Sequence, residues 1–166
     1  EVRVEGKVDR VDCYHGSDRD YIRVIDYKTG GKKFDLSEVV QGLNMQMLLY
    51  LFTLGENGVA DLPSPGEAGV LYMPGSGHFT RDRRDASAES IAEDQRKSYC
   101  MSGMVLDNPE VIEAMELGTA GRYIPVSLKK DGSYTAASSV ITEEQLGLLR
   151  RQIAGNVVWM AELLHE

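Results

Sequence analysis

Alternating apolar and polar residues over the first 28 positions predict a β-hairpin. The first strand is expected to run to about Asp12, and its apolar positions are Val2, Val4 and Val8. The segment 15–20 is rich in turn-forming residues. The following segment 21–27, YIRVIDY, has the β-branched and aromatic character of a second strand. Two strands joined by such a turn are expected to pair as a hairpin.

The second strand is predicted to bring a carboxylate and an amine together. Successive side chains of a strand point to opposite faces, so Ile22, Val24, Asp26 and Lys28 share one face. Asp26 and Lys28 would then project side by side at the end of an apolar face. The carboxylate of Asp9, on the paired strand, could reach the same point.

A helix is predicted directly after this hairpin. Asp35 followed by Glu38 has the pattern of a capping box, and Gly55 is the predicted C-terminal stop after Leu54. The expected inward stripe is Val39, Leu43, Met47, Tyr50 and Leu54. Gln46 lies beside this stripe, four residues before Tyr50, so both side chains can face the same neighbour.

The rest of the chain predicts a mixed α/β structure, with helices flanking a sheet. A buried strand is expected at 69–73, resuming at 78–80, and a loop at 102–103. A second hairpin is expected from a strand at 123–128 and a turn at 131–132. The predicted helices are 88–99, 109–115 and 142–164, the last opened by a capping box of Thr142 and Gln145. Its expected inward residues are Leu146, Leu149, Ile153, Val157 and Met160.

The composition indicates one globular domain. The chain has 166 residues, of which 42% are hydrophobic and 27% charged. No apolar run reaches membrane-spanning length. The opening, EVRV, has no signal-peptide character and is expected to be internal to a longer protein. Two cysteines, Cys13 and Cys100, make no disulfide framework, so a cytoplasmic setting is predicted.

The net charge of −8 is unusual for a protein that binds nucleic acid through a basic surface. A metal site concentrates carboxylates, however, and bound cations offset them. The most basic cluster is Arg81, Arg83 and Arg84, which could contact DNA phosphates. The alternative for this cluster is a solvated loop.

The residues from Gly6 to Tyr50 suit metal-dependent hydrolysis of a phosphodiester. Mg²⁺ prefers oxygen ligands, which Asp9, Asp26 and the backbone carbonyl of Tyr27 could supply. Lys28 could orient the attacking water or neutralise developing charge. Each of these residue types is common in turns and cores. Their combination in a fixed order is what indicates a site.

This combination resembles the RecB-type branch of the PD-(D/E)XK nuclease superfamily, and within it the AddB-type domains of bacterial helicase–nucleases. GKVDRVD is similar to the family's Gly-x-x-Asp-Arg-Ile-Asp, and VIDYKTG to its Val-Asp-Tyr-Lys-Thr/Ser-Gly. The residues from Gln46 to Tyr50 are similar to its Gln-x-x-x-Tyr. The similarity continues through GVLYM, SGMVLDNPEVIEAM and IPVSLKKDG, and therefore covers most of the chain.

The resemblance implies a restriction-endonuclease-like fold, with a central mixed sheet flanked by helices, over a single nuclease domain 1–166. It implies that Asp9 and Asp26 bind Mg²⁺ or Mn²⁺, that Lys28 is catalytic, and that Gln46 and Tyr50 line the site. The implied partners are DNA and an AddA-type helicase–nuclease subunit, without a membrane. The iron–sulfur cluster of longer AddB-type proteins is not expected here, because Cys13 and Cys100 do not match its cysteine spacing.

The implied activity is that of a deoxyribonuclease, an exonuclease serving double-strand break repair. One alternative is a non-catalytic DNA-binding or assembly module that keeps the nuclease fold. The other is a nuclease of the same fold with other substrates, such as a phage or repair exonuclease. The chain has no Gly-x-x-x-x-Gly-Lys-Ser/Thr loop, so ATP hydrolysis is expected to belong to other parts of the complex.

Overall fold

The computed structural model describes residues 3–29, 33–75, 87–118 and 121–164. Its centre is a five-stranded mixed sheet in the order β1-β2-β3-β4-β5. The strands are β1 (Arg10–His15), β2 (Asp20–Lys28), β3 (Gly66–Pro74), β4 (Ser102–Leu106) and β5 (Val140–Ile141). The helices are α1 (Leu36–Val40), α2 (Gln46–Asn57), α3 (Ala88–Ser98), α4 (Pro109–Met115) and α5 (Glu143–Leu163). The predicted fold class, a mixed sheet flanked by helices, is confirmed.

The sheet combines two kinds of strand pairing. β1 and β2 form the predicted antiparallel hairpin. β2 and β3 are parallel, and the long connection that parallel strands need contains α1 and α2. β4 is antiparallel to β3 and parallel to β5. The central strand β3 is buried, as the apolar run at 69–73 predicted.

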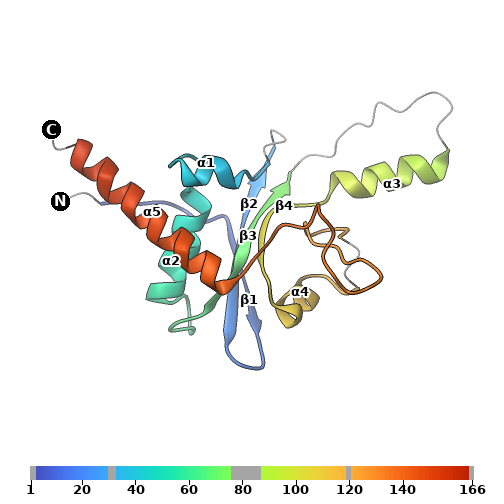
Figure 1. The fold of residues 1–166 in the computed structure, drawn as a ribbon, viewed down its shortest axis with the longest axis horizontal. Coiled ribbons are helices and arrows are strands. Elements are labelled where there is room, and N and C mark those ends of the chain that lie inside the picture. The colour runs from blue at the N-terminus through green and yellow to red at the C-terminus, as the bar shows by residue number, and fades with distance from the viewer. Residues whose placement is uncertain (1–2, 30–32, 76–86, 119–120, 165–166) are drawn as a thin grey trace.

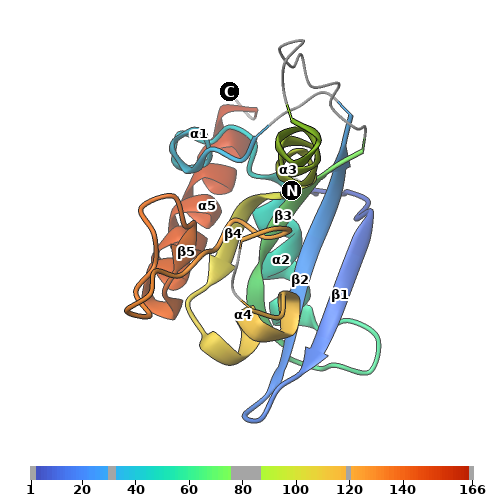
Figure 2. The same ribbon diagram turned by 90° about the vertical axis from the view of Figure 1, so that its right-hand side faces the viewer.

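Helices cover both faces of this sheet (Figures 1 and 2). α2 and α5 lie on one face, and the largest cluster of buried apolar residues fills the space between them and the sheet. α4 and the segment around Ile124 cover part of the other face, over a second cluster that contains Ile25 and Leu71. No helix in the described ranges is long and apolar enough to cross a membrane.

The predicted helix from Asp35 to Leu54 is wrong, because the chain forms two helices there. Gly42, with φ +88°, and Asn44, with φ +52°, adopt left-handed conformations that a continuous helix does not allow. Leu43, expected inward, is 57% exposed as a result. α2 also continues past the predicted stop at Gly55 and ends at Asn57, where Gly58, with φ +80°, is the C-cap.

The predicted capping boxes have different outcomes. Asp35 caps α1 by accepting a hydrogen bond from the Ser37 backbone N–H at 2.8 Å. Its predicted partner Glu38 instead accepts one from the side chain of Asn44. The box that opens α5 is confirmed, since Thr142 and Gln145 each accept from the other's backbone N–H, at 3.2 and 3.0 Å.

Three strand and loop predictions are corrected. Residues 3–9 lie outside the sheet, and β1 begins only at Arg10. Residues 102–103 belong to β4 rather than to a loop, because they pair with β3. The segment 123–128 is not a strand of the sheet, and an isolated bridge joins Leu128 to Tyr134. The continuation predicted at 78–80 lies outside the described residues.

Candidate active site

The end of β2 carries the carboxylate and the amine that the sequence predicted. Lys28 Nζ lies 2.5 Å from Asp26 Oδ2. The side chain of Asp26 is 16% exposed and that of Lys28 is 30% exposed, so the pair is largely shielded from solvent. Contact with Asp26 raises the pKa of Lys28 above its ordinary value, against the opposing effect of burial. The ammonium is therefore charged at neutral pH.

Asp9 lies at the same end of the hairpin as Asp26. The last registered pair of β1 and β2 joins Arg10 to Ile25, so Asp9 is one residue beyond it, on the side of Asp26. The backbone N–H of Tyr27 donates a hydrogen bond to Asp9 Oδ2 at 3.3 Å. Charge on Asp9 also contributes to the raised pKa of Lys28. The hairpin thus gathers two carboxylates and one ammonium around residues 26–28.

Tyr27 can contribute to this site only through its backbone. Its side chain points to the opposite face from Asp26 and Lys28 by the alternation of a strand. There it is 46% exposed and its hydroxyl accepts a hydrogen bond from Arg10 Nη1 at 3.5 Å.

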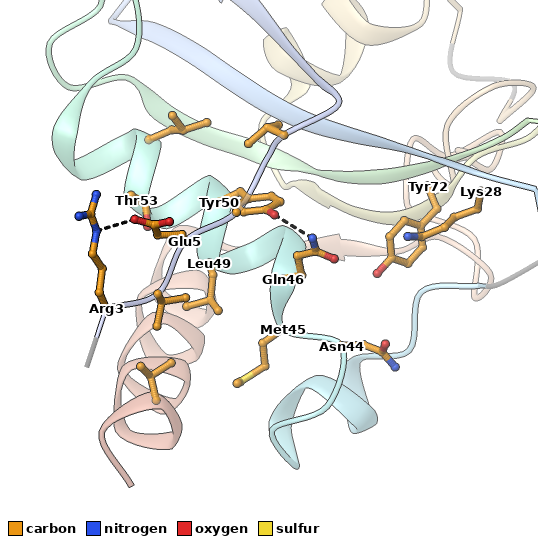
Figure 3. A pocket seen from close by; sticks show the side chains of 15 residues that line it. Arg3, Glu5, Lys28, Asn44, Met45, Gln46, Leu49, Tyr50, Thr53 and Tyr72 are labelled. Atoms are coloured by element: carbon orange, nitrogen blue, oxygen red, sulfur yellow. Dashed lines mark hydrogen bonds and ion pairs between the residues drawn. The ribbon is translucent and has the colours of Figure 1, made fainter. Parts of the chain in front are cut away.

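Gln46 and Tyr50 approach from α2. Gln46 Nε2 donates a hydrogen bond to Tyr50 Oη at 2.7 Å, as their spacing of four residues allows. Both residues line a cavity of about 930 Å³ together with Lys28 (Figure 3). Asp9 and Asp26 are not among the lining residues, and Asp26 reaches the cavity only through its ion pair with Lys28. Of the predicted site residues, Lys28, Gln46 and Tyr50 therefore border one cavity, and Asp26 contacts Lys28 at its edge.

Tyr72 of β3 is a site residue that the sequence reasoning missed. It lines the same cavity, and Lys28 Nζ lies 5.2 Å from the centroid of its ring. Burial raises the pKa of Tyr72 above its ordinary value, although the nearby Lys28 opposes this. The only signal in the sequence is a tyrosine within the apolar run GVLYM. Its place beside Asp26 depends on the register between β2 and β3.

The donor set fits a hard divalent cation. Oδ2 of Asp26 is buried and accepts no hydrogen bond of normal geometry from the described residues, so the Lys28 ammonium is its charge partner. No cluster of three or more His, Cys, Asp or Glu suited to a metal ion occurs within the described ranges. Two carboxylates with a backbone carbonyl suit Mg²⁺, which keeps several of its waters. The predicted DNA contacts Arg81, Arg83 and Arg84 lie outside the described residues.

Comparison with known proteins identifies the family of the chain. The family model described as the PD-(D/E)XK nuclease superfamily matches residues 1–156. The chain belongs to the PD-(D/E)XK nuclease superfamily, and its mixed sheet is the restriction-endonuclease-like fold of that family.

The curated relatives are components of helicase–nucleases. The chain is 37% identical over 164 residues to an ATP-dependent helicase/deoxyribonuclease subunit from Clostridium novyi, with 97% of the chain covered. It is 36% identical over 155 residues, 92% of the chain, to the protein of the same name from Acetivibrio thermocellus. The match takes up 14% of the length of each of these two relatives.

Proposed function

We propose that this protein is a metal-dependent deoxyribonuclease domain that hydrolyses phosphodiester bonds within a helicase–nuclease complex. The observation that carries the proposal is the Lys28–Asp26 ion pair of 2.5 Å, at the edge of a cavity and beside Asp9. Hydrolysis of a phosphodiester needs metal ligands and a cation beside the reacting phosphate, and these residues are of the required types.

Each residue has a defined role in the proposed mechanism. Asp9 and Asp26, with the carbonyl of Tyr27, would hold Mg²⁺ or Mn²⁺. When bound, such an ion lowers the pKa of a coordinated water and stabilises charge on the phosphate. Lys28 holds its ammonium where it can donate to a phosphate oxygen or orient the attacking water. Gln46 and Tyr50 offer an amide and a hydroxyl to the same cavity from α2.

The decisive experiment removes the charge of Asp26 with little change of shape. Asp26→Asn should abolish cleavage of linear DNA in Mg²⁺, because the ligand set loses one of its two carboxylates. Asp20→Asn, on the first residue of the same strand, is the matched control and should retain activity. Circular dichroism and thermal melting establish that both variants are folded. Undiminished cleavage by folded Asp26→Asn would refute the assignment.

A second candidate function is a non-catalytic DNA-binding or assembly module, which the net charge of −8 leaves open. Metal-dependent melting discriminates between the two. A ligand that binds only the folded state raises the melting temperature. Under the nuclease proposal, Mg²⁺ or Mn²⁺ stabilises the wild type and does not stabilise Asp26→Asn. An assembly module would show no stabilisation that depends on Asp26.

We further propose that residues 1–166 form one nuclease domain of a longer subunit, acting on DNA beside an AddA-type helicase–nuclease subunit. The names of the relatives support this partner. A cytoplasmic location is part of this proposal, because the two cysteines make no disulfide framework. An iron–sulfur cluster would need cysteines outside this chain, because such clusters take about four ligands and the chain has two cysteines.

The arginine cluster is a separate proposal. If Arg81, Arg83 and Arg84 contact phosphates, reversing their charges should weaken DNA binding and reduce its salt dependence. Unchanged affinity and salt dependence would identify a solvated loop instead.

A further inference from the structure

The ring of Tyr72 lies within cation–π distance of the Lys28 ammonium. Tyr72 belongs to β3, where its Cα is the register partner of Asp26 in the parallel pair of β2 and β3. Its side chain is 6% exposed. Figure 3 shows the Lys28 nitrogen over the face of the Tyr72 ring, at the end of the cavity away from Arg3.

Two groups from adjacent strands define the position of this ammonium. Asp26 Oδ2 lies 2.5 Å from Nζ, and the ring centroid of Tyr72 lies 5.2 Å from it. The face of an aromatic ring carries partial negative charge, so it attracts a cation without neutralising it. A lysine side chain is long and flexible. An ion pair with Asp26 alone would therefore not fix the position of Nζ. The ring supplies a second fixed contact.

Neighbouring residues hold the Tyr72 ring in place. Phe34 packs against it with ring centroids 6.2 Å apart and planes at 55°. The backbone N–H of Phe34 donates to Ser102 Oγ at 3.2 Å. Ser102 is in turn the register partner of Tyr72 in the antiparallel pair of β3 and β4. Phe34 thus packs on the ring while its own backbone is hydrogen-bonded to the strand next to Tyr72, which restricts the orientation of the ring.

We propose that Tyr72 is a positioning residue, whose ring face holds the Lys28 ammonium beside Asp26 and at the edge of the cavity. The consequence for catalysis rests on the proposed nuclease function, whereas the contact itself does not. The ring, rather than the hydroxyl, performs this role. A phenylalanine at position 72 should therefore keep the position of the Lys28 ammonium. A buried aliphatic residue there should not.

A spectroscopic experiment tests the contact without reference to activity. Protons above an aromatic ring resonate upfield, so the Lys28 Cε protons should be shifted upfield in the NMR spectrum of the chain. The shift should persist in Tyr72→Phe and disappear in Tyr72→Leu. Lys28 resonances that are identical in the wild type and Tyr72→Leu would overturn the proposal.

Steady-state kinetics test the consequence. Tyr72→Leu should lower kcat about 10-fold, the rate equivalent of a partly desolvated cation–π contact, with little change in KM. Tyr72→Phe should keep kcat close to that of the wild type.

Phe52→Leu is the matched control, since Phe52 is also 6% exposed and belongs to the same core cluster. Its ring likewise faces a cation, with the Arg150 guanidinium 5.1 Å from the centroid, but it is not among the residues lining the cavity. An equal loss of kcat in Phe52→Leu would assign the effect to packing and overturn the proposal.

A double-mutant cycle separates action through Lys28 from any other role. In a Lys28→Gln background, Tyr72→Leu should cause no further loss of kcat, because the residue it positions is gone. Equal losses in both backgrounds would overturn the proposal. If the wild type cleaves no DNA in Mg²⁺ or Mn²⁺, the proposed function fails, and the NMR shift alone then decides whether Tyr72 positions Lys28.

Discussion

Gln46 donates a hydrogen bond of 2.7 Å to the hydroxyl of Tyr50 across one turn of α2, and both side chains border the cavity that Lys28 also lines. The bond orients two polar groups toward the same space. Gln46→Leu and Tyr50→Phe each break it, and each should lower the cleavage rate roughly 10-fold, with small effects on stability.

The double variant identifies whether Gln46 and Tyr50 act as a unit. Two groups that work through one hydrogen bond show non-additive losses. The double variant should therefore be about as slow as the slower single variant when rates are measured on the same DNA substrate. Losses that multiply would mean that the two residues contribute separately.

Gly6 is expected to be intolerant of any side chain, because the segment before β1 passes directly over Tyr50. A Cβ built at Gly6 would lie 2.2 Å from Tyr50 Oη and 2.5 Å from its Cε1. Gly6→Ala must displace the ring or the segment, and overpacking of this kind costs about 1–3 kcal/mol of unfolding free energy. Urea denaturation measures the loss, and DNA cleavage should fall with it.

The control for Gly6 is a glycine with free space around it. A Cβ at Gly155, in α5, would meet nothing within 4 Å. Gly155→Ala should stabilise the protein by about 0.5–1 kcal/mol, because alanine is the better helix former. If Gly6→Ala did not lower the free energy of unfolding either, the close approach of Gly6 to Tyr50 would not contribute to stability.

Glu116 is predicted to secure the segment that covers the second face of the sheet. It is 7% exposed, and its carboxylate accepts hydrogen bonds of 2.9–3.0 Å from the backbone N–H groups of Arg122, Tyr123 and Ile124. Both carboxylate oxygens are engaged, so an amide in either orientation would turn its NH₂ toward a donor.

Glu116→Gln should therefore destabilise the fold by about 1–3 kcal/mol, the range for buried bonds to a charged group. Chemical denaturation at neutral pH is the measurement. Glu113→Gln, at an exposed position of α4 (the helix that Glu116 follows), should change stability by less than about 0.5 kcal/mol. Equal effects of the two variants would contradict the role of Glu116.

Asp12 should make stability depend on pH in the acid range. Burial opposes its ionisation, but hydrogen bonds from Arg10 and Arg23 outweigh this and lower the pKa of Asp12 below its ordinary value. A carboxyl group whose pKa is lower in the folded state stabilises the fold above its unfolded pKa of about 3.9. This contribution is lost as the pH falls through the folded pKa.

Urea denaturation between pH 2 and 5 tests this prediction. Asp12→Asn should be less stable than the wild type at pH 5, and the difference should shrink as the pH falls. A difference between the two proteins that is constant across this range would show that ionisation of Asp12 does not contribute.

The periodicity of the sequence correctly predicted contacts between residues that are close together in the chain. Alternation placed Asp26 and Lys28 on one face, and a spacing of four placed Gln46 beside Tyr50; both contacts are present. The broken helix was missed because Gly42 and Asn44 sit within an apolar pattern that is otherwise helical, and only their left-handed conformations end α1. The capping box at Asp35 is only half formed, because Asp35 caps α1 whereas Glu38 accepts a hydrogen bond from Asn44 instead.

By itself, the sequence determined the hairpin, the face of β2, the capped C-terminal helix and the order of the chemical groups, because short-range periodicity and turn chemistry decide these. Only the tertiary structure decided that Tyr72 lies beside Lys28 and that Gly6 passes over Tyr50. The first contact depends on the register of two strands separated by α1 and α2. The second depends on how an extended segment packs on a helix. Such contacts join residues far apart in the chain, and packing of the whole core selects them.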